Sequence, residues 1–215
     1  MSNAPTREVA RRVFATEFND ATFTFKESDD ERAPLYALLP TGESANRVFV
    51  VGTLTETEDI GDDSEYWRGR VVDPTGTFFV YAGQYQPDAA SALRDAETPT
   101  YVAVVGKPRT FETDDGSVNV SLRPESITHV DEATRDRWVV ETAERTMERL
   151  EAFDEEGNEY AERARTEYGE DVSPYRQAVL DALEDFDGQD ATGSSAAGEN
   201  AADAADDEAE PAPDA

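Results

Sequence analysis

The stretch from residue 67 to residue 81 constrains the fold of this chain most strongly, because it holds two β-type runs joined by a defined turn. The turn is Asp73-Pro74-Thr75-Gly76. Proline fixes φ near about −65°, glycine can supply a positive φ, and aspartate can accept a hydrogen bond from the backbone two residues on. Apolar and aromatic residues dominate both arms, with arginines between them on the first. The stretch therefore predicts a β-hairpin.

The segment 46–130 continues this β pattern with a single helical interruption. Strands are predicted at 48–55, 66–72, 77–81, 101–111 and 118–122, with a short helix at 87–95. The extended segment 127–130 continues or follows the last strand after Pro124. We expect the fourth strand to kink or end at Lys107-Pro108, because proline cannot donate to a ladder. An acidic loop is predicted at 56–65 and a hairpin turn at 114–117. Five strands with one helix between the third and fourth is the order of the OB-fold, a small Greek-key barrel.

An arm of 45 residues precedes the predicted barrel. Residues 6–18 favour a helix, because Thr6 can cap it and apolar side chains recur on one face: Val9, Val13, Phe14 and Phe18. Two short extended pieces are expected within 22–39, followed by the turn Leu39-Pro40-Thr41-Gly42.

Helices are expected after the barrel, in a region that spans 131–186. Asp131 can cap the first, and the second is expected to end at Gly169. Ser173-Pro174 is a typical start for the third. The apolar stripe of the first helix could pack within the chain or bind a partner protein; its candidate partner-binding residues are Trp138, Thr142, Leu150 and Phe153. Residues 187–215 contain no aromatic and no basic residue, so we expect a disordered acidic tail. The predicted class is mainly β with α extensions.

The acidic composition restricts the conditions under which this chain can meet nucleic acid. It has 49 acidic and 19 basic residues, a net charge of −30. Such a surface is typical of proteins adapted to very salty cytoplasm, where the screening length falls to about 3 Å at 1 M salt. An anionic protein would repel nucleic acid in dilute buffer but hardly at that ionic strength.

Several classes of site are excluded or disfavoured by composition. The chain has no cysteine and one histidine, His129, so disulfides and Cys/His zinc sites are excluded. We find no Walker loop and no nucleophile elbow, and we expect no enzyme activity, no cofactor and no metal. The apolar runs are too short to span a bilayer and no secretory signal is evident, so a soluble cytoplasmic protein, associated with the nucleoid, is expected.

The candidate binding residues follow from the barrel prediction. OB-folds bind ligands on the face of strands two and three and at the flanking loops. In this chain those places hold Trp67, Arg68, Arg70, Phe79, Tyr81, Lys107, Arg109, Phe111 and Arg123. The rings would stack on bases and the cations would contact phosphates. Strand alternation puts Trp67 on the opposite face from Arg68 and Arg70, and the two arginines favour their own face as the exposed one.

Several separate motifs resemble the archaeal RPA-associated proteins. They are the hairpin with Gly83-Gln84-Tyr85-Gln86-Pro87, Leu39-Pro40-Thr41-Gly42, Val105-Gly106-Lys107-Pro108-Arg109, Leu122-Arg123-Pro124-Glu125 and Thr134-Arg135-Asp136-Arg137-Trp138. The resemblance covers roughly residues 6–153. It implies a single OB-fold that works with replication protein A, the single-stranded DNA binder of replication and repair. Two functions remain open: a single-stranded DNA-binding accessory subunit, or a protein-binding module that holds replication protein A with little DNA contact.

Overall fold

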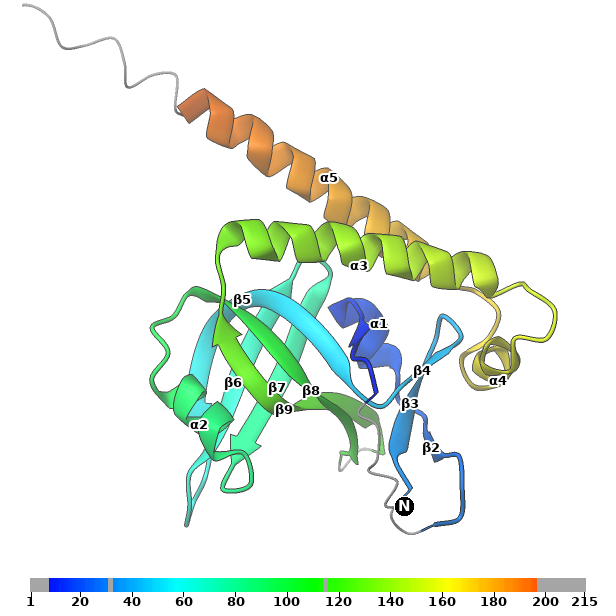
Figure 1. The fold of residues 1–215 in the computed structure, drawn as a ribbon, viewed down its shortest axis with the longest axis horizontal. Helices are drawn as coiled ribbons and strands as arrows, with labels where there is room; N and C mark the ends of the chain where they lie inside the picture. The colour runs from blue at the N-terminus through cyan, green and yellow to red at the C-terminus, as the bar shows by residue number, and fades with distance from the viewer. Residues whose placement is uncertain (1–7, 31–32, 114–115, 197–215) are drawn as a thin grey trace, which may run out of the picture.

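The computed structural model describes residues 8–30, 33–113 and 116–196, with side chains as far as residue 184 (Figure 1). Five strands form the barrel: β5 (Val48–Asp59), β6 (Tyr66–Asp73), β7 (Gly76–Gly83), β8 (Thr100–Glu112) and β9 (Val118–His129). Their order is β5-β6-β7-β9-β8, and β8 also pairs with β5, which closes the barrel. The β7–β9 pair is parallel, at Val80 and Leu122, and the other barrel pairs are antiparallel. The molecule has the predicted OB-fold.

The barrel interior is filled by alternate side chains of its strands. Phe78, Val80 and Leu122 are fully buried there, and helix α2 (Pro87–Arg94), between β7 and β8 in the chain, packs against the same core through Leu93. A Cβ at Gly69 would lie 2.7 Å from Leu93 Cδ2, so a side chain at this position of β6 would force Leu93 of α2 to move.

Two details of the predicted barrel strands change in the structure. Strand β5 continues through Asp59, so the first part of the predicted acidic loop is strand and the connection to β6 spans only 60–65. Strand β8 runs through Pro108 without ending there, so of the predicted kink or end at Lys107-Pro108 the end is wrong. The β5–β8 ladder ends at Gly106, so Pro108 pairs with β9 alone in the described ladder and its missing N–H interrupts no bond to β5.

The N-terminal arm differs from the predicted helix over 6–18. Residues Arg11–Arg12 form a short strand, β1, parallel to β5, and the helix α1 spans only Ala15–Asp20. The helix begins at Ala15 because Asp73, from the β6–β7 turn, accepts a hydrogen bond from its backbone N–H at 2.8 Å. Extended backbone before that point still buries Val13 and Phe14 in the core. Thr6, the predicted cap, lies outside the described residues.

A second, smaller sheet follows the arm, with the order β2-β3-β4. Its strands are β2 (Thr24–Lys26), β3 (Leu35–Leu39) and β4 (Glu43–Ala45), and β2 and β3 confirm the two predicted extended pieces. Gly42 closes the predicted turn with φ +84°, donating from its N–H to the Leu39 carbonyl at 3.0 Å.

Three helices follow the barrel, as predicted: α3 (Glu132–Ala152), α4 (Glu159–Tyr168) and α5 (Ser173–Ala196). Asp131 caps α3, accepting from the Thr134 N–H at 2.9 Å. In Figure 1, α3 lies across one side of the barrel, and α5 passes behind α3 at an angle before extending away. Helix α5 continues past residue 186, where the helical region was predicted to end, and reaches residue 196; no proline interrupts it after Pro174. The rest of the predicted tail, 197–215, lies outside the described residues.

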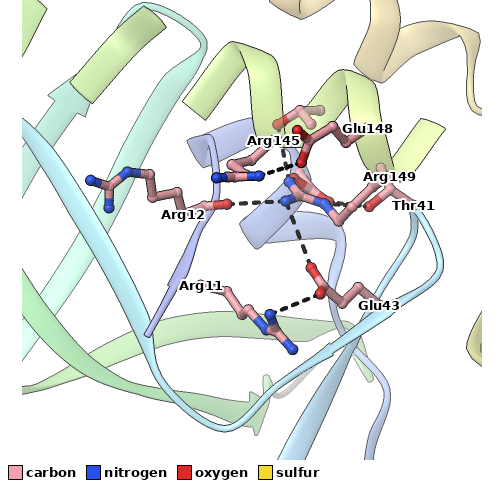
Figure 2. Close-up of polar contacts among 9 residues, drawn as sticks. Arg11, Arg12, Thr41, Glu43, Arg145, Glu148 and Arg149 are labelled. Carbon is pink, nitrogen blue, oxygen red and sulfur yellow. Dashed lines mark hydrogen bonds and ion pairs between the residues drawn. The ribbon is translucent and has the colours of Figure 1, made fainter. Parts of the chain in front are cut away.

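Arg149 of α3 joins the arm and the small sheet to the helices. Its guanidinium is nearly buried and forms an ion pair with the buried Glu17 of α1, Nη2 to Oε2 at 2.6 Å. It also donates to Thr41 Oγ1 at 3.1 Å and to the Arg12 carbonyl at 3.3 Å, and Figure 2 shows these two groups around it. One side chain therefore holds three separate segments of the chain together.

Asp73 makes the hairpin turn in a different way from the predicted one. Gly76 is not among the glycines with positive φ; instead Asp73 Oδ1 accepts from the N–H groups of Thr75 at 2.7 Å and Gly76 at 2.9 Å. The predicted bond two residues on is thus confirmed. Burial raises the pKa of Asp73 to about 6, although these hydrogen bonds and the one from Ala15 lower it.

We expect Asp73 to make the free energy of unfolding fall as pH rises from about 4 to about 6. In that window the unfolded chain has lost this proton and the folded chain retains it, so ionisation opposes folding by roughly 2–3 kcal/mol in total. Urea denaturation of wild type and Asp73→Asn at several pH values isolates the effect. The difference between the two proteins should change through this window and level off above it; a constant difference would contradict the assignment.

Candidate nucleic-acid interface

The outward face of β6 and β7 carries the arginines and not Trp67. Arg68 pairs in register with Tyr81, and Arg70 with Phe79, and all four side chains are half-buried. Trp67 alternates to the other side, where it packs against the core and its Nε1 is buried with no hydrogen-bond partner in the described structure. The preference of the arginines for the exposed face is confirmed, and Trp67 does not present its ring there as a stacking platform.

The two arginines on this face are already paired with carboxylates. Glu58 lies opposite Arg68 on β5 and Glu56 lies opposite Arg70, and each forms an ion pair across the strands, the second at 3.3 Å. Exposed pairs of this kind contribute about 0–1 kcal/mol to stability, but they neutralise the charge that a phosphate would meet.

The cations on β8 and β9 are different, because no carboxylate neutralises them in the described structure. Lys107 pairs in register with Arg123, and Arg109 with Ser121, so these side chains share one face of the hairpin. No ion pair joins Lys107, Arg109 or Arg123 to any described carboxylate. Burial lowers the pKa of Arg109, and the neighbouring positive charge of Arg123 lowers it further. We call these three residues the cationic cluster.

Rings and cations meet at a hollow of about 380 Å³ on this surface, which we call the interface hollow. Its lining includes Tyr66, Tyr81, Arg109, Phe111 and Arg123. The Tyr66 and Tyr81 rings stack, with centroids 5.9 Å apart and planes at 22°. Tyr66 and Phe111 are each 44% exposed, so their faces are accessible to a ligand.

Tyr66 was not among the predicted binding residues. Strand alternation could have found it, because it lies two residues before Arg68 and therefore on the same face. Its position is fixed by Asp59, whose Oδ1 accepts from the N–H groups of Gly61 at 3.1 Å and Tyr66 at 3.0 Å. These hydrogen bonds lower the pKa of Asp59. Within the described residues no cluster of His, Asp and Glu side chains could hold a metal ion.

The predicted partner-binding residues lie inside the molecule. Trp138, Thr142, Leu150 and Phe153 are each at most 3% exposed, and Trp138 Nε1 donates to the Phe49 carbonyl of β5 at 3.1 Å. Their stripe packs within the chain, which is the first of the two alternatives that its pattern allowed. Val140 of α3 and Leu180 of α5 are instead exposed apolar side chains.

Comparison with solved structures supports the fold. A chain of the Schizosaccharomyces pombe (S. pombe) Stn1–Ten1 complex matches with a TM-score of 0.50 and 13% identity, over 75% of this chain and 100% of that one. The second single-stranded DNA-binding protein of Mycobacterium smegmatis matches 39% of this chain and 84% of its own, with a TM-score of 0.34 and 20% identity. No protein-family model and no curated protein sequence matches the chain. The molecule is an OB-fold protein similar in structure to the Stn1–Ten1 chain.

No helix among the described residues is both long and apolar enough to cross a membrane.

Proposed function

We propose that this chain is a non-enzymatic single-stranded DNA-binding accessory subunit that acts with replication protein A in archaeal replication and repair. The observation that carries the DNA-binding part is the interface hollow, where the stacked Tyr66 and Tyr81 rings adjoin the un-neutralised Arg109 and Arg123. The replication protein A partner rests on the sequence motifs that resemble the archaeal RPA-associated proteins.

In this mechanism bases stack on exposed rings while phosphates contact the cationic cluster. Tyr81, Tyr66 and Phe111 supply ring faces, and stacking contributes about 1–3 kcal/mol per base. Arginine binds a phosphate through paired N–H donors. The protein has a net charge of −30, and we place it in a halophile. Molar salt there screens the anionic surface and reduces the gain in binding free energy from counterion release. Stacking therefore contributes a larger share of the affinity at high salt than at low salt.

Comparing an unpaired arginine with a paired one tests this proposal. Arg109→Ala should weaken binding of a fluorescein-labelled oligothymidine by about five- to tenfold and reduce the salt slope by about one. Arg68→Ala, the matched control, should change the affinity by less than about twofold, because Glu58 already neutralises Arg68. Fluorescence anisotropy at several salt concentrations measures both. Equal losses for the two variants would contradict the assigned surface.

A protein-binding module is the second candidate function, favoured by the paired state of Arg68 and Arg70. Both predicted cations on the β6–β7 face are neutralised, and Val140 and Leu180 are 39% and 46% exposed on α3 and α5. Gel filtration of the chain with replication protein A, with and without an oligonucleotide, separates the two functions. Co-elution without DNA, together with no affinity of the isolated chain for DNA, would favour the module.

A further inference from the structure

A second hollow adjoins the interface hollow. It has a volume of about 560 Å³ and lies over the connection between β7 and α2, where its lining includes Tyr85, Pro87 and Asp88. Gln86 and Arg123 line both hollows, so the two share a wall. The connection is part of Gly83-Gln84-Tyr85-Gln86-Pro87, a motif to which the function proposed above gives no role.

Tyr85 is the most exposed large hydrophobic residue described, at 84%. The loop around it is a defined turn, because the Gln86 N–H donates to the Gly83 carbonyl at 2.8 Å and the helix α2 begins at Pro87. The phenol ring is therefore presented to solvent from a hydrogen-bonded turn beside the second hollow.

The charges around the second hollow suit a base better than a phosphate. Glu125 is neutralised by Arg47, Nε to Oε2 at 2.8 Å. Asp88 forms no ion pair within the described structure, so its carboxylate would repel a phosphate there. Arg123, at the shared wall, is the cation that can hold a phosphate between the two hollows.

We propose that single-stranded DNA continues from the interface hollow across Arg123 into the second hollow, where a further base stacks on Tyr85. This inference rests on the proposed DNA-binding function and extends it with a second stacking position on the β7–α2 connection. The occupant is a nucleobase, because the hollow offers a ring and no unneutralised cation apart from Arg123 among the described residues that line it.

Length dependence of binding tests the second position. Site sizes of OB-folds range from about 4 to 16 nucleotides, so oligothymidines of about 4 and about 12 nucleotides bracket the one-hollow and two-hollow lengths. Tyr85→Ala should weaken binding of the longer oligonucleotide by about five- to tenfold and leave that of the shorter one within about twofold. Tyr85→Phe, the matched control, retains the ring and should bind both like wild type. Because Tyr85 is so exposed, both variants should keep the wild-type circular dichroism spectrum.

The outcomes separate this inference from the function on which it rests. If the wild-type protein binds both oligonucleotides and Tyr85→Ala binds them with the same affinity, the second stacking position is overturned and the proposed function stands. An equal loss at both lengths would also overturn it, because Tyr85 would then belong to the first contacts of the strand. If the wild-type protein binds neither the shorter nor the longer oligonucleotide, the proposed function and the second stacking position are both overturned.

Discussion

Replacing Arg149 with leucine should lower the free energy of unfolding by about 3–5 kcal/mol, because it leaves the buried carboxylate of Glu17 without its cation. Glu17 is 1% exposed, so its carboxylate depends on the guanidinium and not on bulk water for stabilisation of its charge. The change also removes the N–H groups that donate to Thr41 and to the Arg12 carbonyl. These hydrogen bonds connect α3 to the arm and to the β3–β4 turn.

Urea denaturation of the full chain measures this effect, with Arg145→Leu as the matched control. Arg145 is on the same helix but exposed, and its ion pair with Glu148 is 2.6 Å long (Figure 2). Its loss should cost less than about 1 kcal/mol. The double variant Glu17→Leu/Arg149→Leu should be more stable than Arg149→Leu alone, because no buried charge is left unpaired. A cost for Arg149→Leu as small as that for Arg145→Leu would contradict the role of this pair.

The second large effect is on DNA affinity. Tyr81→Ala should weaken binding of single-stranded DNA by about 5- to 150-fold, which corresponds to the roughly 1–3 kcal/mol of one stacking contact. The ring is on the outward face of β7, stacks with Tyr66 and lines the interface hollow. Because stacking is screened less than charge pairing, the loss should persist in molar salt, where the effect of Arg109→Ala diminishes.

Trp67→Phe is the control that separates the two faces of β6. Trp67 is aromatic and next to Arg68 in sequence, but its ring packs against the core. The variant should bind DNA within about twofold of wild type, although its stability falls. Anisotropy titrations under conditions where both variants are folded make the comparison. A large loss of DNA affinity for Trp67→Phe, with none for Tyr81→Ala, would contradict the assignment of the binding face to the outward side of β6 and β7.

The sequence was sufficient to predict the barrel, because its strands alternate and its turns carry explicit signals. The helix order after Asp131 was equally evident from caps and apolar spacing. The arm was not predicted correctly: Val9, Val13 and Phe14 have helical spacing, yet the backbone becomes helical only at Ala15. That outcome depends on the hydrogen bond from Ala15 to Asp73, which is far away in sequence and has no local signal.

The binding residues were predicted only in part, because charge pairing depends on strand register. Strand β5 shifts register between Leu54 and Glu56, and this irregularity sets which glutamate faces Arg68 and which faces Arg70. The sequence shows an acidic segment beside an arginine-bearing strand but not which pairs form. The un-neutralised state of Arg109 and Arg123 is a consequence of the same tertiary arrangement, so only the structure distinguishes them from the paired arginines.

Photocrosslinking is the most direct test of the central claim that the outward face around the interface hollow holds single-stranded DNA. The full chain would be irradiated in molar salt with an oligonucleotide that carries 5-iodouridine, and the adducts mapped by mass spectrometry. Adducts at Tyr66, Tyr81 and Phe111 are the predicted result. Adducts confined to α3 and α5, with none on β6 to β9, would contradict it.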